Sequence, residues 1–234
     1  MSQTIGLLAG TVFYHQKYFA QAERKTIETD FGQTAVLLTG RWAYVARHGL
    51  EGEAYLPPHR INHAANLAAL KKVGVKEIIG VNSCGSLRPS LGPGSVVLPN
   101  DYIALARVET IFNDHREHIV PMLSERVQKK LSTAAKAAGV YLVKGGIYWQ
   151  TPGPRLETKA EIRLLAHYAD MVGMTMASEA TIAQEMGLEY ASLCSVDNHA
   201  HGLSPIPLTG EEIMANAGAN ADKIFKIIQA YPEE

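Results

Sequence analysis

The chain has 234 residues, of which 47% are hydrophobic and 19% are charged, and its formal net charge is -1. This length and balance are typical of one large globular domain with a sizeable core. A net charge so near zero gives no electrostatic footprint for nucleic acid or for an anionic membrane. The start before Ile5 is short and polar, unlike a signal peptide, and no apolar run approaches the roughly 18 residues of a membrane span.

Short apolar runs alternate with stretches of helical period along the whole chain. In chain order, the pattern predicts strands at 5–9, 35–38 and 42–46, a helix at 61–74, strands at 77–82 and 96–99, a long loop at 108–121, a helix at 124–138, a strand at 140–150, a helix at 159–168, a strand at 171–175, a helix at 179–186, a strand at 190–196 and a helix at 209–231. Strands that alternate with helices predict a single α/β domain, residues 1–234, with a mainly parallel or mixed central β-sheet flanked by helices.

The stretch QTPGPRLETKAE, residues 150–161, leads from a predicted strand through a Pro-Gly-Pro turn into a predicted helix. Thr158 and Glu161 have capping-box spacing, which predicts that the helix begins near Thr158. Glu157 is then expected in the loop before the helix, with its carboxylate free to face a ligand.

The two cysteines, Cys84 and Cys194, lie in or beside apolar, strand-like segments. This placement favours buried thiols in a reduced, cytoplasmic protein over a disulfide scaffold. His199 and His201 have the spacing of a metal-ligand pair, but no cysteine or carboxylate cluster completes a site, so no metal is predicted.

Residues that could contact a ligand, most of them polar, lie where the predicted strands end. They are Gly10-Thr11, Arg47-His48, Asn82-Ser83, Glu157, Met174-Thr175 and Asn198. In open α/β sheets, ligands bind beyond the carboxyl ends of the strands. The sequence therefore predicts one ligand site at that edge of the sheet.

Several of these segments together resemble a known family. They are RHG at 47–49, PPHRINHAANLAALKKVGV at 57–75, NSCGS at 82–86, GPRLET at 153–158 and MVGMTMASEATIAQEMGLEYASL at 171–193. Over residues 5–228 the chain resembles the trimeric purine nucleoside phosphorylases, which include the methylthioadenosine and methylthioinosine phosphorylases. The resemblance implies phosphorolysis of an N-glycosidic bond, with inorganic phosphate as co-substrate and no cofactor.

The resemblance also assigns roles to individual residues. It implies phosphate contacts from Thr11, Arg47, His48, Asn82, Ser83 and Thr175, ribose contacts from Met174 and His59, and base recognition by Glu157 and Asn198. An arginine can grip phosphate with a bidentate fork, and a histidine can donate a ring N–H. Taken singly, each residue also has a structural explanation, such as a salt bridge for Arg47, core packing for Met174 or a turn cap for Asn198.

Glu157 and Asn198 predict a preference for 6-oxopurines. A carboxylate can accept from N1–H, and an amide can donate to O6 while it accepts a proton that develops at N7. An adenine base reverses both edges and leaves the buried groups unpaired. The resemblance implies that the region after Asn198 borders the 5′ end of the sugar. The stretch 203–208 in this region is apolar, which favours a methylthio group over a hydroxyl at the 5′ position, as in S-methyl-5′-thioinosine over inosine or guanosine.

The resemblance further implies a homotrimer, or a dimer of trimers, in which a neighbouring subunit closes each sugar site. The predicted loop at 108–121, which contains Ile111 and Phe112, is the candidate for that contact.

The sequence departs from the family pattern at Val12, where glycine is usual, and at Ser178, where proline is usual. A β-branched residue resists positive φ, so Val12 is expected to narrow the phosphate loop. These two departures motivate a second hypothesis, a nucleoside-binding regulatory protein with an impaired phosphate site. A methylthioadenosine phosphorylase and a hydrolytic nucleosidase are further alternatives. A dinucleotide-binding enzyme is disfavoured because no GxGxxG follows the first strand.

Overall fold

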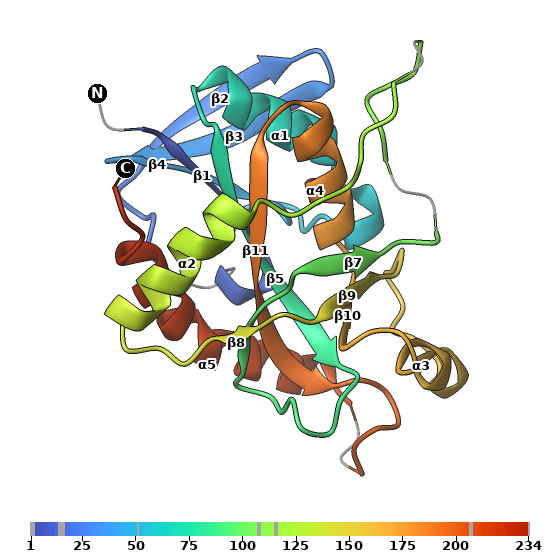
Figure 1. Ribbon diagram of the computed structural model, residues 1–234. Helices are drawn as coiled ribbons and strands as arrows, with labels where there is room; N and C mark the ends of the chain where they lie inside the picture. Colours follow the sequence, from blue (N-terminus) through green and yellow to red (C-terminus); the bar gives the residue numbers. More distant parts are fainter. Residues whose placement is uncertain are drawn as a thin grey trace.

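The computed structural model describes residues 3–13, 17–50, 52–106, 109–114, 117–205 and 208–233. Through these residues runs one mixed sheet of eleven strands, with helices on both faces (Figure 1). The strands are β1 (Ile5–Ala9), β2 (Glu23–Thr29), β3 (Gly32–Thr39), β4 (Trp42–Ala46), β5 (Glu77–Ser86), β6 (Val96–Leu98), β7 (Asp101–Ile103), β8 (Val143–Lys144), β9 (Ile147–Gln150), β10 (Met171–Gly173) and β11 (Glu189–His199). The helices are α1 (His63–Lys72), α2 (Glu125–Ala137), α3 (Lys159–Leu165), α4 (Met176–Glu185) and α5 (Gly210–Gln229), with 3-10 turns η1 (Thr11–Phe13) and η2 (Pro58–Arg60).

The central strands are buried on both faces, which explains their continuous apolar runs. On one face, Leu7 of β1 packs in a cluster with residues of α2 and α5. On the other face, Leu8 packs in a second cluster with residues of α1 and α4. Each fully buried leucine contributes about 1.5–3 kcal/mol to the free energy of folding relative to an exposed one. Packing on both faces therefore stabilises the strands whose ends carry the site.

The sheet has an opening along one edge of the long strand β5. Along one edge of β5, β11 pairs in parallel from Glu77 to Ser86. Along the other edge, β1 pairs in parallel as far as Val81, and β10 pairs antiparallel from Gly85 onward. Within the described part of the chain, no strand pairs with that edge at 82–84. The sheet therefore opens where β1 ends and β10 begins.

The predicted helices are confirmed, and their caps explain where they begin. The Thr158 side chain accepts from the Glu161 backbone N–H while the Glu161 carboxylate accepts from the Thr158 N–H, which completes the predicted capping box of α3. Ser124 caps α2 and Thr209 caps α5 in the same way at the N3 position. Helix α4 begins at Met176, earlier than predicted.

Two strands were not predicted, and one predicted strand is wrong as a continuous element. Strand β2 (ERKTIET) is mostly exposed and shows no apolar alternation, yet it pairs with β3 along its whole length. Strand β7 has only three residues. The predicted strand at 140–150 divides into β8 and β9, because Gly145 and Gly146 adopt positive φ between them.

The predicted loop at 108–121 is irregular at the described positions 109–114 and 117–121, while 108, 115 and 116 lie outside the described residues. Apolar side chains are exposed around it: Leu105, Val120 and Met122 are 80%, 74% and 61% exposed.

No helix within the described ranges is long and apolar enough to cross a membrane.

Candidate active site

A cavity of about 410 Å³ lies at the opening in the sheet. Seven of the ten predicted site residues line it: Thr11, Arg47, His48, Ser83, Met174, Thr175 and Asn198. They come from the ends of β1, β4, β5, β10 and β11, as the rule for open α/β sheets predicts. The predicted convergence of strand ends on one site is therefore observed.

Three predicted residues do not line this cavity. Asn82 is fully buried behind it, and its Nδ2 donates to Thr175 Oγ1 at 2.9 Å. His59 is exposed on η2, although its neighbour Pro58 does line the cavity. Glu157 lines two other hollows beside it, of about 220 and 560 Å³. The Glu157 carboxylate is not free as expected, because it is only 7% exposed and accepts from Thr151 Oγ1 at 2.6 Å.

Arg47 is the charged residue among those that line this cavity, and it is 2% exposed. Its Nε and Nη2 donate to the two carboxylate oxygens of Glu179 on α4, at 2.6 and 3.0 Å. Nη1 donates to Val81 O at 2.6 Å, and Nη2 also donates to Leu8 O at 2.9 Å. Among the described residues, these contacts use four of the five guanidinium N–H donors, and one on Nη1 is left. The expected bidentate grip on phosphate is therefore wrong for this structure, since Glu179 occupies the fork.

His48 follows Arg47 and also differs from expectation. Its Nδ1 lies 2.7 Å from Leu56 O, and a carbonyl can only accept, so Nδ1 carries the proton. Burial lowers the pKa of His48 to about 4, so the ring is neutral near neutral pH and Nε2 is an acceptor. A side chain on Gly10 would collide with the His48 ring, whose Cδ2 would lie 2.5 Å from an added Cβ. Glycine at this turn thus lets the imidazole reach the end of β1.

Asn198 reaches the cavity through a β-bulge that the sequence did not reveal. Val196 pairs with Cys84 and Asn198 pairs with Gly85, so Asp197 is the extra residue in β11. A bulge changes the direction of the side chain that follows it. Asn198 Nδ2 donates to His199 O at 2.9 Å, which leaves one N–H and the Oδ1 acceptor for a ligand.

Asp197 was not singled out from the sequence, although it lies fully buried directly before Asn198. Its Oδ1 accepts from the Ser195 hydroxyl, while Oδ2 is buried without a hydrogen-bond partner among the described residues. Asn216 and Asn220 of α5 donate to the backbone of Asp197 and to Ser195 Oγ, which ties α5 to the bulge. Burial raises the pKa of Asp197 to about 6.

This pKa predicts a pH-dependent loss of stability. The folded state holds the Asp197 proton more tightly than the unfolded state, whose pKa is near 3.8. Stability is therefore present below that value and is lost as the pH rises toward 6, by about 3 kcal/mol in total. In urea unfolding at a series of pH values, Asp197→Asn should gain stability relative to wild type by about this amount between about pH 4 and about pH 7.

Asp170→Asn is a control with the opposite sign. Although burial acts against it, the Arg88 guanidinium and the Ile147 N–H hold the pKa of Asp170 below its usual value. This variant should lose stability relative to wild type as the pH rises. If the stability of both variants relative to wild type changed with pH in the same direction, the protonation of Asp197 would be contradicted.

The two departures from the family pattern have structural explanations. Val12 is 1% exposed in the core, and none of the described residues other than glycine has positive φ. Val12 therefore does not need the positive φ from which a narrowed loop was expected. Ser178 uses the backbone N–H that a proline would lack: it donates to Gln150 Oε1 at 3.1 Å, and Ser178 Oγ accepts from Gln150 Nε2 at 2.7 Å.

The rest of the cavity wall is largely apolar. It is formed by Tyr55, Pro57, Pro58, Leu156, Ile213 and Met214, none of which was predicted as a site residue. The Tyr55 ring stacks on His48 with centroids 5.0 Å apart. Ile213 and Met214 lie in the first turns of α5, so this helix closes one side of the site.

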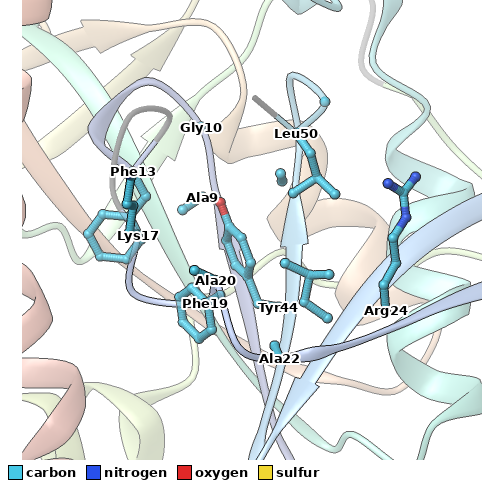
Figure 2. A pocket seen from close by; sticks show the side chains of 13 residues that line it. Ala9, Gly10, Phe13, Lys17, Phe19, Ala20, Ala22, Arg24, Tyr44 and Leu50 are labelled. Carbon is cyan, nitrogen blue, oxygen red and sulfur yellow. The ribbon is translucent and has the colours of Figure 1, made fainter. Parts of the chain in front are cut away.

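A second cavity, of about 530 Å³, lies beside the same turns at Gly10 and Gly49 (Figure 2). Figure 2 shows Tyr44 between Phe19 and Leu50, and the Phe19 and Tyr44 rings stack with centroids 4.4 Å apart. Its lining is mainly apolar, with Lys17 and Arg24 as the charged groups. None of the predicted site residues lines it.

Metal ligands are not grouped in the described ranges: no three His, Cys, Asp or Glu side chains lie together so that they could hold an ion. Cys84 and Cys194 are both buried and free, as expected. His201 Nδ1 instead donates to Glu157 O at 3.0 Å, which joins the two loops beside Asn198.

The chain is similar over nearly its whole length to several known proteins and to solved structures. A protein of Archaeoglobus fulgidus named "Probable 6-oxopurine nucleoside phosphorylase" is 43% identical, over 96% of this chain and 94% of that protein. One of Methanothermobacter thermautotrophicus named "Probable S-methyl-5'-thioinosine phosphorylase" is 36% identical, over 97% of this chain and 82% of that protein. The methylthioadenosine phosphorylase of Schistosoma mansoni in complex with adenine superposes with a TM-score of 0.86 at 24% identity, over 98% of this chain and 90% of that chain, which confirms the predicted fold. Residues 4–232 match the sequence profile described as "Phosphorylase superfamily", and the chain belongs to that family.

Proposed function

We propose that the protein is an enzyme that catalyses phosphorolysis of a 6-oxopurine nucleoside, giving the free base and ribose 1-phosphate or its 5-methylthio derivative. The observation that carries the proposal is the single cavity at the opening of β5. It brings the hydroxyl residues Thr11, Ser83 and Thr175, together with Arg47, into one site with Asn198. The names of the similar proteins of A. fulgidus and M. thermautotrophicus support the same reaction class.

In this reaction phosphate attacks the anomeric carbon of the ribose as the purine leaves. Positive charge develops on the sugar and negative charge on the base, so the enzyme gains most by orienting the reactants and stabilising these charges. The Thr11, Ser83 and Thr175 hydroxyls and the last Arg47 N–H would donate to phosphate. Neutral His48, whose Nε2 is an acceptor, would take a hydrogen bond from the hydroxyl of monohydrogen phosphate.

At the base, Asn198 would donate its remaining N–H to O6 and accept at Oδ1 from N7–H as the base departs. Glu157 would join it on N1–H only after it exchanges its hydrogen bond from Thr151. A methylthioadenosine phosphorylase is less well supported, because the Asn198 amide donor would face the 6-amino donor of adenine.

A 5′-methylthio substituent is the finer part of the proposal. The wall formed by Pro57, Pro58, Ile213 and Met214 offers apolar contact and little hydrogen bonding to a 5′-hydroxyl. Burying a methylthio group there would recover about 25 cal/mol for each Å² of apolar surface removed from water.

The proposal includes assembly as a homotrimer and a reducing, cytoplasmic setting. Leu105, Val120 and Met122 are exposed beside the loop at 108–121. They form an apolar surface that a second copy of the chain could cover. The buried free thiols Cys84 and Cys194 suit a reducing compartment.

Phe112→Ala tests whether the loop at 108–121 contacts the substrate site of a neighbouring subunit. Phe112 is half-buried within the subunit. The variant should raise the KM for nucleoside about 10-fold, which corresponds to about 1.4 kcal/mol of lost contact, while the melting temperature changes little. Tyr141→Ala is the control, because Tyr141 is 85% exposed on a different loop. A wild-type monomer in light scattering at assay concentration, with full activity, would contradict a shared site.

The function itself is tested by product analysis. Inosine, guanosine, adenosine, methylthioinosine and methylthioadenosine are each incubated with the protein, with and without phosphate, and free base is measured. Base release from oxopurine nucleosides that requires phosphate is the expected result. Release without phosphate would favour hydrolysis, and tight nucleoside binding without base release would favour a regulatory protein.

A further inference from the structure

A buried chain of hydrogen bonds lies directly under the phosphate end of the cavity. It begins at Glu179, which holds the fork of Arg47. The Tyr190 hydroxyl donates to Glu179 Oε2 at 2.7 Å and lies 3.3 Å from Asn82 Oδ1. Asn82 Nδ2 in turn donates to Thr175 Oγ1 at 2.9 Å. Tyr190 therefore stands between the residues that hold Arg47 and Thr175, the two cavity-lining ends of the chain.

The direction of these hydrogen bonds is determined by their donors. Ser192 Oγ donates to Asn82 Oδ1 at 2.6 Å, and Tyr190 approaches the same oxygen. The Asn82 carbonyl therefore faces two hydroxyls, and its amide nitrogen must face Thr175. Because Thr175 Oγ1 already accepts from Asn82, its own hydrogen is directed elsewhere, and Thr175 lines the cavity. These hydrogen bonds therefore leave the Thr175 hydroxyl free to donate to an anion in the cavity.

The position of Tyr190 depends on a glycine in the neighbouring strand. A Cβ on Gly80 would lie 2.0 Å from the Tyr190 hydroxyl oxygen and 2.9 Å from Asn82 Oδ1. No larger residue leaves room for the phenol at this place. Burial and the Glu179 carboxylate keep the pKa of Tyr190 well above its usual value, so the phenol retains its proton as a donor.

We propose that Tyr190 is a positioning residue for phosphate: its hydroxyl couples the Arg47–Glu179 pair to the Asn82–Thr175 pair, so that both face the anion together. Tyr190 itself is 3% exposed and does not line the cavity. Its effect is therefore confined to the geometry of the groups that touch phosphate. The inference rests on the proposed phosphorolysis.

Tyr190→Phe is the direct test, and the chain offers a matched control. Tyr231 is also buried, and its hydroxyl donates to Glu77 Oε2 at 2.7 Å, at the opposite end of β5. Both variants remove one phenol–carboxylate hydrogen bond from the core. We expect Tyr190→Phe to raise the KM for phosphate about 10-fold or more, with a smaller change in kcat and in the KM for nucleoside. Tyr231→Phe should lower the melting temperature by a similar amount and leave the KM for phosphate unchanged.

A second measurement does not depend on turnover. Inorganic phosphate should raise the melting temperature of the wild-type protein, since a ligand that binds the folded state stabilises it. The phosphate concentration that gives half of this rise should increase in Tyr190→Phe and stay the same in Tyr231→Phe.

A third variant tests whether Asn82 must donate its hydrogen bond to Thr175. In Asn82→Asp the side chain can only accept, so the Thr175 hydroxyl would turn toward it and away from phosphate. This variant should lose phosphate binding more completely than Tyr190→Phe.

The outcomes separate the inference from the function on which it rests. If wild-type protein releases base without phosphate, the proposed function fails. If wild type requires phosphate but Tyr190→Phe and Tyr231→Phe lose stability alike and keep the same KM for phosphate, Tyr190 is a structural residue and the inference is overturned.

Discussion

Replacing Arg47 by alanine is expected to lower the free energy of unfolding by about 3–5 kcal/mol, because Glu179 would remain as an unpaired charge in the core. Glu179 is 1% exposed, and Arg47 supplies its two guanidinium contacts. His63 cannot replace that charge. Its Nδ1 lies 3.9 Å from Glu179 Oε1, and burial together with Arg47 lowers the pKa of His63 to about 3. Urea unfolding of the wild type and the variant measures the loss.

A double variant separates the structural role of Arg47 from its role toward phosphate. In Arg47→Met with Glu179→Gln, no charge is left unpaired, and the glutamine carbonyl can still accept from the Tyr190 hydroxyl. The unfolding free energy should therefore return close to the wild-type value. The KM for phosphate should remain about 10- to 150-fold higher, since one charge-assisted hydrogen bond is worth about 1.5–3 kcal/mol. Recovery of both quantities would show that Arg47 does not contact phosphate.

The location of the site could be predicted from the sequence, because polar residues at strand ends are visible as interruptions of apolar runs. Arg47 and Asn198 each follow such a run. In a sheet of this class the carboxyl ends of parallel strands meet at one edge, so neither the partner strands nor the register had to be known. The capping box of α3 and the Thr209 cap of α5 could be predicted for a similar reason, since each depends on residues only three positions apart.

Contacts between distant elements could not be predicted. Glu179 lies on a helix 132 positions after Arg47, and its carboxylate decides how much of the guanidinium remains for a ligand. The bulge at Asp197 could not be predicted either, because it is a shift in the register between β11 and β5, which lie far apart in the sequence. Strand β2 was missed because it is exposed on an edge of the sheet and its stability comes from pairing with β3.

Asn198→Asp is expected to have the largest effect on the choice of base. The Asn198 amide offers one free N–H, which suits the O6 acceptor of an oxopurine. A carboxylate at this position would accept from the 6-amino group of adenine and repel O6. It would also face His199 O, to which the amide now donates. Because Glu157 accepts from Thr151 and does not line the cavity, we propose Asn198 as the main base-recognition group.

One reversed polar contact costs about 1–3 kcal/mol, so the ratio of kcat/KM for inosine to that for adenosine should fall about 5- to 150-fold in Asn198→Asp. Asn216→Asp is the matched control, because Asn216 also donates its amide to a backbone carbonyl, Asp197 O at 2.7 Å, but does not line the cavity. That variant should lower both activities in parallel and leave their ratio unchanged. If Asn198 only stabilises the end of β11, the two variants will behave alike. An unchanged base ratio in Asn198→Asp would therefore reject its assignment to O6 and N7.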